Sequence, residues 1–264
     1  MTVHHLNCAT LKPPGTFGGR LSPTRLVAHC LLVERPDGGL TLVDSGFGTA
    51  DIANPKRLGQ PFRAVVGPVL DPTETALAQI KALGREPEEV TDVVLTHLDL
   101  DHAGGIGDFP RARIHVFEEE LDRALNPPLR EKARYIQAQW AHGPQWVRHR
   151  VRGEEWFGFD SVTVLGDDVL LVPLRGHTHG HCGVAVRDGE RWLLHAGDAY
   201  FFHGDKDTPR TCPPALRFFQ SAMQVDGRAR HHNQDRIRHL QSEGHADLTI
   251  FSAHDAVEFD AFGG

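Results

Sequence analysis

Residues 96–102 read Thr-His-Leu-Asp-Leu-Asp-His and directly follow the apolar run of residues 93–95. Four side chains of this heptapeptide can bind a metal ion, namely His97, Asp99, Asp101 and His102. An apolar run that leads into Ala-Gly-Gly at 103–105 indicates a buried strand that ends in a loop. Because a buried carboxylate is costly unless it is paired or bound to a metal, the heptapeptide predicts a metal site at the end of a core strand.

The composition is that of an ordinary globular protein. The chain has 264 residues, of which 40% are hydrophobic and 24% are charged. It contains no internal repeat or long linker, so we expect a single domain over residues 1–264. The net charge of −7 argues against a nucleic-acid partner, because nucleic-acid binders usually carry a basic excess.

The sequence also bears on location and redox state. No run approaches the ~18 apolar residues of a membrane span, and residues 1–7 lack the features of a signal peptide. We therefore expect a cytoplasmic protein with no membrane partner. The four cysteines are scattered without a CxxC pair, so neither a disulfide framework nor a zinc knuckle is indicated.

The first hundred residues alternate between strand and helix patterns. Residues 26–33 and 40–43 are typical of a hairpin. A helix is predicted over 72–83, with Asp71 as its N-cap and Glu74 completing a capping box. A strand over 91–96 leads into the heptapeptide. This alternation favours an α/β arrangement.

Residues 110–160 differ in character. A strand is predicted at 113–117 and a short helix at 118–125. A second helical stripe of apolar residues follows, consisting of Leu129, Ala133, Ile136 and Trp140. We interpret the segment as a helical insertion that packs on the core. A sharper alternative is that it also walls a substrate pocket, since pockets are lined mostly by apolar and aromatic groups.

Three further segments place candidate ligands where predicted strands end. They are Gly-His-Thr-His-Gly-His at 176–181, the pair Gly197-Asp198, and His254 after the last strand at 248–251. Additional strands are predicted at 162–165, 169–172 and 192–194, and a helix at about 227–242. Loops at strand ends on a rigid sheet are where functional sites are usually built, so we expect the four segments to converge.

As a set, these motifs resemble the metallo-β-lactamase-fold hydrolase superfamily. Its leading motif is His-x-His-x-Asp-His, followed by a Gly-His-Thr-x-Gly-His loop, a Gly-Asp pair and a final histidine. The resemblance extends from residues 42–46 to His254. It implies an α/β fold, a four-layer αββα sandwich with a helical insertion near 118–160.

The resemblance also implies a ligand set. His97, Asp99 and His181 would bind a first metal ion, and Asp198 would bridge to a second. The second ion would be held by Asp101, His102 and His254. In this assignment His177 orients ligands or the loop, and His179 is not a ligand.

Asp99 departs from the family pattern, which usually has a histidine there. Carboxylate is a harder ligand than imidazole, so manganese or iron competes better with zinc, although zinc remains the expected ion at both positions. Glutamate at this position is found in the similar flavodiiron proteins. An alternative is that Asp99 points away and leaves one tightly bound metal ion.

The function implied by the resemblance is hydrolysis of a small carbonyl substrate by a metal-bound hydroxide. A lactone or carboxylic ester is the expected substrate. Asp101 would steer or shuttle the proton, and Tyr200 would polarise the carbonyl group. The alternative for Tyr200 is a packed side chain beside Phe201 and Phe202.

Other functions stay open. A glyoxalase-II-like thioester hydrolase is the nearest, and Asp99 suggests an iron-dependent oxidoreductase. A catalytically idle metal-binding sensor is a further alternative. The expected partner is a small-molecule substrate; the oligomeric state is open, with a homodimer as one option.

Overall fold

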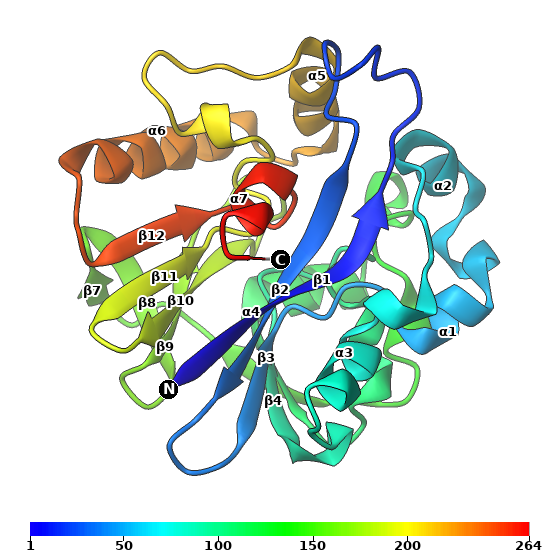
Figure 1. The fold of residues 1–264 in the computed structure, drawn as a ribbon, viewed down its shortest axis with the longest axis vertical. Helices are drawn as coiled ribbons and strands as arrows, with labels where there is room; N and C mark the ends of the chain where they lie inside the picture. Colours follow the sequence, from blue (N-terminus) through cyan, green and yellow to red (C-terminus); the bar gives the residue numbers. More distant parts are fainter. Residues whose placement is uncertain (264) are drawn as a thin grey trace.

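Two six-stranded sheets form the centre of the protein, as described by a computed structural model for residues 1–263. The first sheet has the order β1-β2-β3-β4-β5-β6, with bounds Thr2–Leu11, Leu26–Glu34, Leu40–Val43, Val90–Val94, Arg113–Phe117 and Gln145–His149. The second has the order β12-β11-β10-β9-β8-β7, with bounds Leu248–Phe251, Arg191–His195, Cys182–Asp188, Val169–Pro173, Phe159–Leu165 and Glu154–Trp156. The helices lie outside the two sheets (Figure 1).

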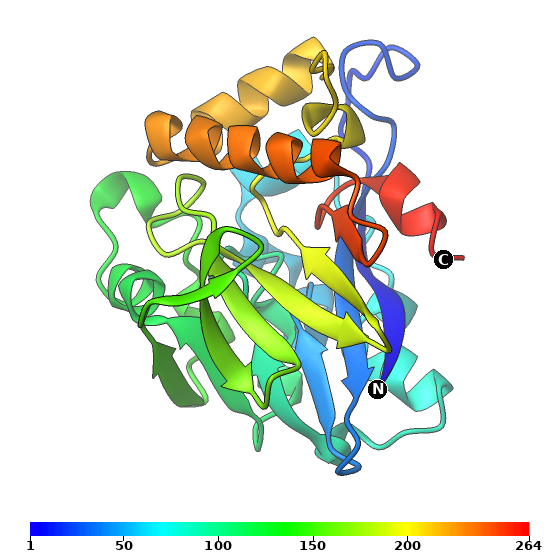
Figure 2. The same cartoon turned by 90° about the vertical axis from the view of Figure 1, so that its left-hand side faces the viewer.

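The helices are short except for one. Their bounds are α1 Thr49–Ala53, α2 Gln60–Val66, α3 Ala76–Ala82, α4 Glu118–Leu125, α5 Pro214–Met223, α6 Gly227–Glu243 and α7 Ala256–Asp260. Helix α6, orange in Figure 2, lies across the second sheet. Within residues 1–263, no helix combines the length and hydrophobicity needed to cross a bilayer.

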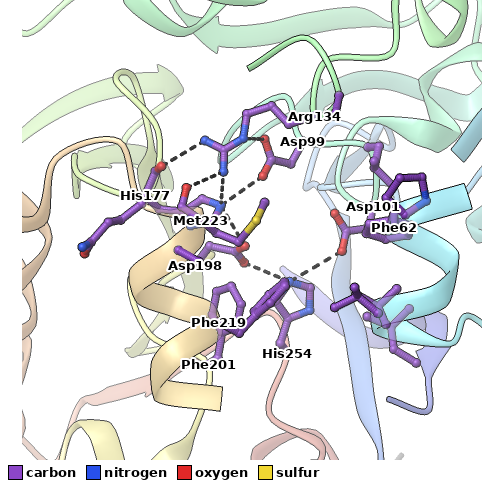
Figure 3. A pocket seen from close by; sticks show the side chains of 18 of the residues that line it. Phe62, Asp99, Asp101, Arg134, His177, Asp198, Phe201, Phe219, Met223 and His254 are labelled. Atoms are coloured by element: carbon purple, nitrogen blue, oxygen red, sulfur yellow. Dashed lines mark hydrogen bonds and ion pairs between the residues drawn. The ribbon is translucent and has the colours of Figure 1, made fainter. Parts of the chain in front are cut away.

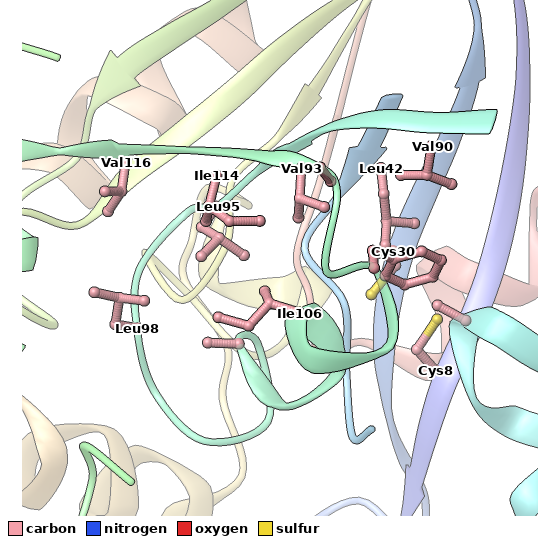
Figure 4. Packing of buried hydrophobic residues seen from close by; sticks show 14 of the residues in the cluster. Cys8, Cys30, Leu42, Val90, Val93, Leu95, Leu98, Ile106, Ile114 and Val116 are labelled. Atoms are coloured by element: carbon pink, nitrogen blue, oxygen red, sulfur yellow. The ribbon is translucent and has the colours of Figure 1, made fainter. Parts of the chain in front are cut away.

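Successive side chains of a strand point to opposite faces of the sheet, and this explains how the layers pack. In β2, Leu31 and Val33 join a cluster with Leu171 and Val184 of the second sheet, so they fill the space between the sheets. The intervening Leu32 faces the opposite way, into a cluster shared with α3 and α4. Figure 4 shows part of that cluster, where β4, β5 and the loop after β4 pack together.

The second sheet is covered in the same manner on its outer face. Ile237 and Leu240 of α6 pack against Leu170, Leu194 and Ile250. Helix, sheet, sheet and helix therefore follow one another, which confirms the predicted α/β, four-layer αββα sandwich.

Strand direction brings the predicted loops to one edge. Strands β3, β4 and β5 run parallel, as do β11 and β12. The heptapeptide follows β4, Asp198 follows β11 and His254 follows β12. The carboxyl ends of these strands thus deliver the ligand segments, with the loop at 174–181 after β9.

The predicted helix over 72–83 is interrupted. Residues Pro72–Glu74 form a 3-10 turn, and α3 begins only after Thr75, whose hydroxyl accepts a hydrogen bond from the Ala78 N–H. The Glu74 side chain does not complete a capping box with Asp71. It instead accepts hydrogen bonds from the backbone N–H and hydroxyl of Thr10, at 2.7 and 2.6 Å.

The apolar stripe at 129–140 is not a helix, contrary to the prediction. Only 3-10 turns form, at Leu129–Glu131 and Gln137–Gln139. Side chains replace the helical hydrogen-bond ladder: Gln137 donates to the Ala124 carbonyl, and Arg134 donates to the carbonyls of His177 and Met223. Long-range polar contacts therefore override the helical periodicity.

Candidate metal centre

The first ligand group joins three of the strand-end loops. His97, Asp99, His177 and Asp198 each offer one ligand atom, and these atoms lie within 4.8 Å of one another. His177 Nε2 lies 3.0 Å from Asp99 Oδ2 and 3.3 Å from Asp198 Oδ2. His97 Nε2 lies 3.6 and 3.7 Å from the same two oxygens. All four side chains are buried.

A second group lies on the other side of Asp198. It consists of Asp101, His102 and His254. Asp198 Oδ1 lies 3.3 Å from His102 Nε2 and 3.1 Å from His254 Nε2, and Asp101 Oδ2 lies 3.8 Å from His254 Nε2. Asp198 thus presents Oδ2 to the first group and Oδ1 to the second, which is the arrangement of a bridging ligand.

These groups fit divalent metal ions. Bonds of about 2.0–2.2 Å in a tetrahedron separate neighbouring ligand atoms by roughly 3.3–3.6 Å, close to the observed spacings. His97 Nε2 and Asp198 Oδ1 are buried polar atoms without a hydrogen-bond partner, although most buried polar groups in proteins have one. Converging, unsatisfied donor atoms are what a metal site requires.

The outer nitrogens of the histidine rings are held in place. His102 Nδ1 lies 2.8 Å from Asp44 Oδ2, and His254 Nδ1 lies 2.7 Å from the Val27 carbonyl. His97 Nδ1 lies 2.9 Å from the Thr96 hydroxyl. Such contacts set the ring tautomer and direct Nε2 inward, as around metal-binding histidines generally.

The carboxylates and imidazoles of the site shift one another's pKa. Burial raises the pKa of the Asp198 carboxyl, but His254 and His102 outweigh burial and hold that pKa well below its ordinary value. Burial lowers the pKa of His102, yet Asp198 and Asp44 raise it well above normal. At His177 burial outweighs Asp198 and Asp99, and the pKa of this imidazole is lowered.

His181 does not join either group, contrary to its assignment from the sequence. Its Nδ1 lies 2.8 Å from the Leu174 carbonyl, and its Nε2 accepts a hydrogen bond of 2.8 Å from the backbone N–H of Asp198. Both ring nitrogens are therefore engaged. The structure places His177 in the first group instead, and His181 supports the loop that carries Asp198.

Tyr200 also lies away from the ligand groups. Its side chain is 1% exposed, and its hydroxyl donates to the Glu258 carboxylate at 3.1–3.2 Å. It is a packed side chain, as in the alternative considered for it, but it belongs to the core of the second sheet and not to the cluster that contains Phe201 and Phe202. The structure thus does not bring Tyr200 to the position of a carbonyl-polarising group. His179 is not part of either group, and its ring lies 2.8 Å from an Arg123 nitrogen.

A cavity of about 420 Å³ opens onto the two groups. Asp99, Asp101, His177, Asp198 and His254 line its floor (Figure 3). Most of its wall is apolar, including Leu26, Phe62, Val66, Phe201, Phe219 and Met223. The cavity therefore suits a substrate with an apolar part next to the group that reacts.

The insertion contributes to this wall, as the sharper interpretation proposed, although Ala133 is the one residue of its apolar stripe that lines the cavity. Arg130, Glu131, Ala133 and Arg134 line the cavity. Trp140 and Trp146 pack instead against the outer core of the first sheet. No local sequence pattern marked Arg134, because the polar contacts of its side chain are all with segments distant along the chain.

Replacing Asp44 by asparagine is expected to weaken metal binding by about 10–100-fold, as is typical when the partner of a ligand histidine is changed. Asp44 is buried, and besides His102 it accepts hydrogen bonds from the N–H and hydroxyl of Thr96 at 2.8 Å. The amide loses the negative charge that favours His102 in its ligand tautomer. Competition with a chromogenic chelator measures the change. Asp71→Asn, at an exposed turn, is the control, and unchanged affinity in Asp44→Asn would contradict this role.

Comparisons with known proteins agree with the geometry. The family model of the metallo-beta-lactamase superfamily matches residues 23–236. A "probable metallo-hydrolase", Rv2300c of Mycobacterium tuberculosis, is 45% identical over 257 residues, which cover 96% of this chain and 80% of the relative.

Two lactonases are similar at a greater distance. The N-acyl homoserine lactonase AttM of Rhizobium johnstonii is 34% identical over 173 residues, covering 64% of each chain. A crystal structure of a mutant of Bacillus thuringiensis AiiA, with N-decanoyl-L-homoserine bound at its active site, superposes with a TM-score of 0.75 at 18% identity. That match covers 98% of this chain and 95% of the other. The chain belongs to the metallo-beta-lactamase superfamily and is a metal-dependent hydrolase.

Proposed function

We propose that the protein is a dinuclear hydrolase that cleaves a lactone or carboxylic ester with an apolar acyl part. The observation that carries this proposal is Asp198, whose two oxygens face separate ligand groups at the floor of an apolar cavity. The similarity to lactonases supports the choice of substrate class.

Two divalent cations are the cofactors that we propose, with four ligand side chains in the first group and three plus Asp198 in the second. Such ions would lower the pKa of water from 15.7 to about 7 and polarise the carbonyl oxygen of the substrate. Zinc is the ion that we expect. Manganese or iron competes better than at an all-imidazole site, because Asp99 adds a hard oxygen ligand.

The chain's own residues then bind the substrate and handle the proton. The apolar wall holds the acyl part and excludes bulk water from the floor. Asp101, whose side chain is 12% exposed, faces this cavity beside His254. We assign to its carboxylate the role of accepting the proton of the attacking water and passing it to the leaving alkoxide.

A substrate panel tests the proposal. Protein reloaded with zinc or manganese is assayed against short- and long-chain lactones, an aryl ester and a thioester. We expect hydrolysis of lactone and ester above a His97→Ala control. We also expect efficiency to rise with acyl length by up to about fourfold per methylene, which corresponds to ~0.8 kcal/mol. His239→Ala on the exposed face of α6 is the matched histidine control and should retain activity.

The same panel addresses the alternatives. Turnover of the thioester alone would favour a glyoxalase-II-like enzyme, and oxygen consumption by the iron-loaded protein would favour an oxidoreductase. Metal binding without turnover of any substrate in the panel would contradict the proposed function.

A further inference from the structure

Asp99 has two oxygens with different neighbours. Oδ2 faces the first ligand group, 3.0 Å from His177 Nε2. Oδ1 faces Arg134, whose Nε lies 3.0 Å away in an ion pair that is not aligned as a hydrogen bond. Figure 3 shows the Arg134 guanidinium beside Asp99 and His177, and its Nη2 lies 3.5 Å from His177 Nε2. Asp99 therefore faces the first ligand group with one oxygen and a fixed positive charge, which borders the same group, with the other.

Arg134 is itself held by the protein. Its Nη1 donates to the His177 carbonyl at 3.1 Å, and its Nη2 donates to the Met223 carbonyl at 2.9 Å. Only 6% of the side chain is exposed, and among residues 1–263 Asp99 is its one ion-pair partner within 4.0 Å. All three guanidinium nitrogens are engaged, so Arg134 is held in a fixed position against Asp99 at the wall of the cavity.

The total charge of the site suggests what the pair of Asp99 and Arg134 does. Asp99, Asp101 and Asp198 carry three negative charges, so two divalent cations would leave one positive charge. Arg134 restores a second positive charge. A neutral histidine at position 99 without the arginine would give the same total, so Asp99 and Arg134 together are electrostatically equivalent to one neutral ligand.

We propose that Asp99 and Arg134 function as one neutral ligand unit. Asp99 coordinates the first metal ion through Oδ2, and the positive charge of Arg134 next to Oδ1 offsets the negative charge of the carboxylate. Arg134 is then a positioning residue that limits how tightly the ion is held and keeps it electron-poor towards a carbonyl oxygen. The inference rests on metal binding at the proposed site, and metal affinity tests it separately from turnover.

Two single substitutions have opposite expected effects. Arg134→Met keeps much of the volume and removes the charge that repels the cation, so the first ion should bind at least about tenfold more tightly. Asp99→His leaves Arg134 unpaired next to the metal position, so the first ion should bind at least about tenfold more weakly. In Arg134→Met, turnover of any hydrolysed ester should fall although the site is full.

The double variant is the decisive measurement. Asp99→His combined with Arg134→Met should return the affinity of the first ion to within about threefold of the original protein, because the total charge is restored. Affinity is measured by chelator competition, and metal content by elemental analysis. The absorption spectrum of the cobalt-loaded protein shows whether the first position is filled.

Controls separate this role from simple packing. Arg35→Met removes an arginine paired with the buried Asp92, away from both ligand groups, and should change stability without changing metal affinity. If Arg134→Met does not fold, Arg134→Lys retains the charge and should keep near-original affinity. Weaker metal binding in Arg134→Met, or equal affinities in Asp99→His and the double variant, would overturn the proposal.

Discussion

Asp198→Asn is expected to lower hydrolysis by about 10³-fold or more and to reduce the bound metal. The contribution of a metal to transition-state charge stabilisation is several kcal/mol, and each 1.36 kcal/mol is a factor of ten in rate. Asp198 is the one side chain that faces both ligand groups in the described part of the chain, so its replacement affects both ions. Turnover of the best substrate of the panel and elemental analysis measure the two effects.

The matched control for Asp198→Asn is Asp92→Asn. Asp92 is equally buried and ionised, but it pairs with Arg35, Arg113 and His115 at the other end of the first sheet. Its replacement should cost stability and leave metal content unchanged. Full metal content and turnover in Asp198→Asn would disprove the bridging assignment.

Removal of metal is expected to lower the melting temperature by roughly 8–16 °C. An ion present at 1,000 times its dissociation constant stabilises the folded state by about 4.1 kcal/mol. For domains of about this size, each kcal/mol corresponds to about 2–4 °C. The structural reason is that Asp99, Asp101 and Asp198 converge in a buried site, where a cation relieves the repulsion between their charges.

Thermal unfolding with a chelator, and again after an excess of zinc or manganese is restored, measures this difference. His97→Ala should lose most of the metal-dependent increase because it removes a ligand that is fully buried. Equal melting temperatures with and without metal in the original protein would argue against a metal site at these residues.

Much of the architecture could be predicted from local pattern. The hairpin of β2 and β3, the strand before the heptapeptide, α4 and α6 lie close to their predicted positions. The strands are marked by apolar runs, and α6 is marked by its ends, with Asp226 as N-cap and Gly244 as C-cap. The stripe at 129–140 had a helical period but did not form a helix, because its polar side chains bind backbone groups of distant segments.

Three elements, α1, α2 and β1, were not predicted for a related reason. Helices α1 and α2 have only 5 and 7 residues and begin after glycine without a side-chain cap. Strand β1 pairs with β2 over most of its length but carries two histidines and an asparagine on its partly exposed positions. Their structure depends on the neighbours they pack against more than on their own sequence.

The sequence by itself determined where the ligands lie along the chain and which family the chain resembles, because residues at the ends of buried strands are placed by local structure. Only the tertiary structure decided which histidine of 176–181 faces the metal position. The backbone N–H of Asp198 donates a hydrogen bond to Nε2 of His181, so that nitrogen is not available to a metal ion. Nε2 of His177 instead lies beside the carboxylate of Asp198.

The same holds for Tyr200 and Asp99. The Tyr200 hydroxyl donates a hydrogen bond to Glu258, 58 residues further along the chain, and this bond holds the side chain in the core. Arg134, in an irregular segment without a sequence signal, gives Asp99 its counter-charge. Contacts between distant segments have no local period, so the chemistry of this site became visible only once the fold had brought those segments together.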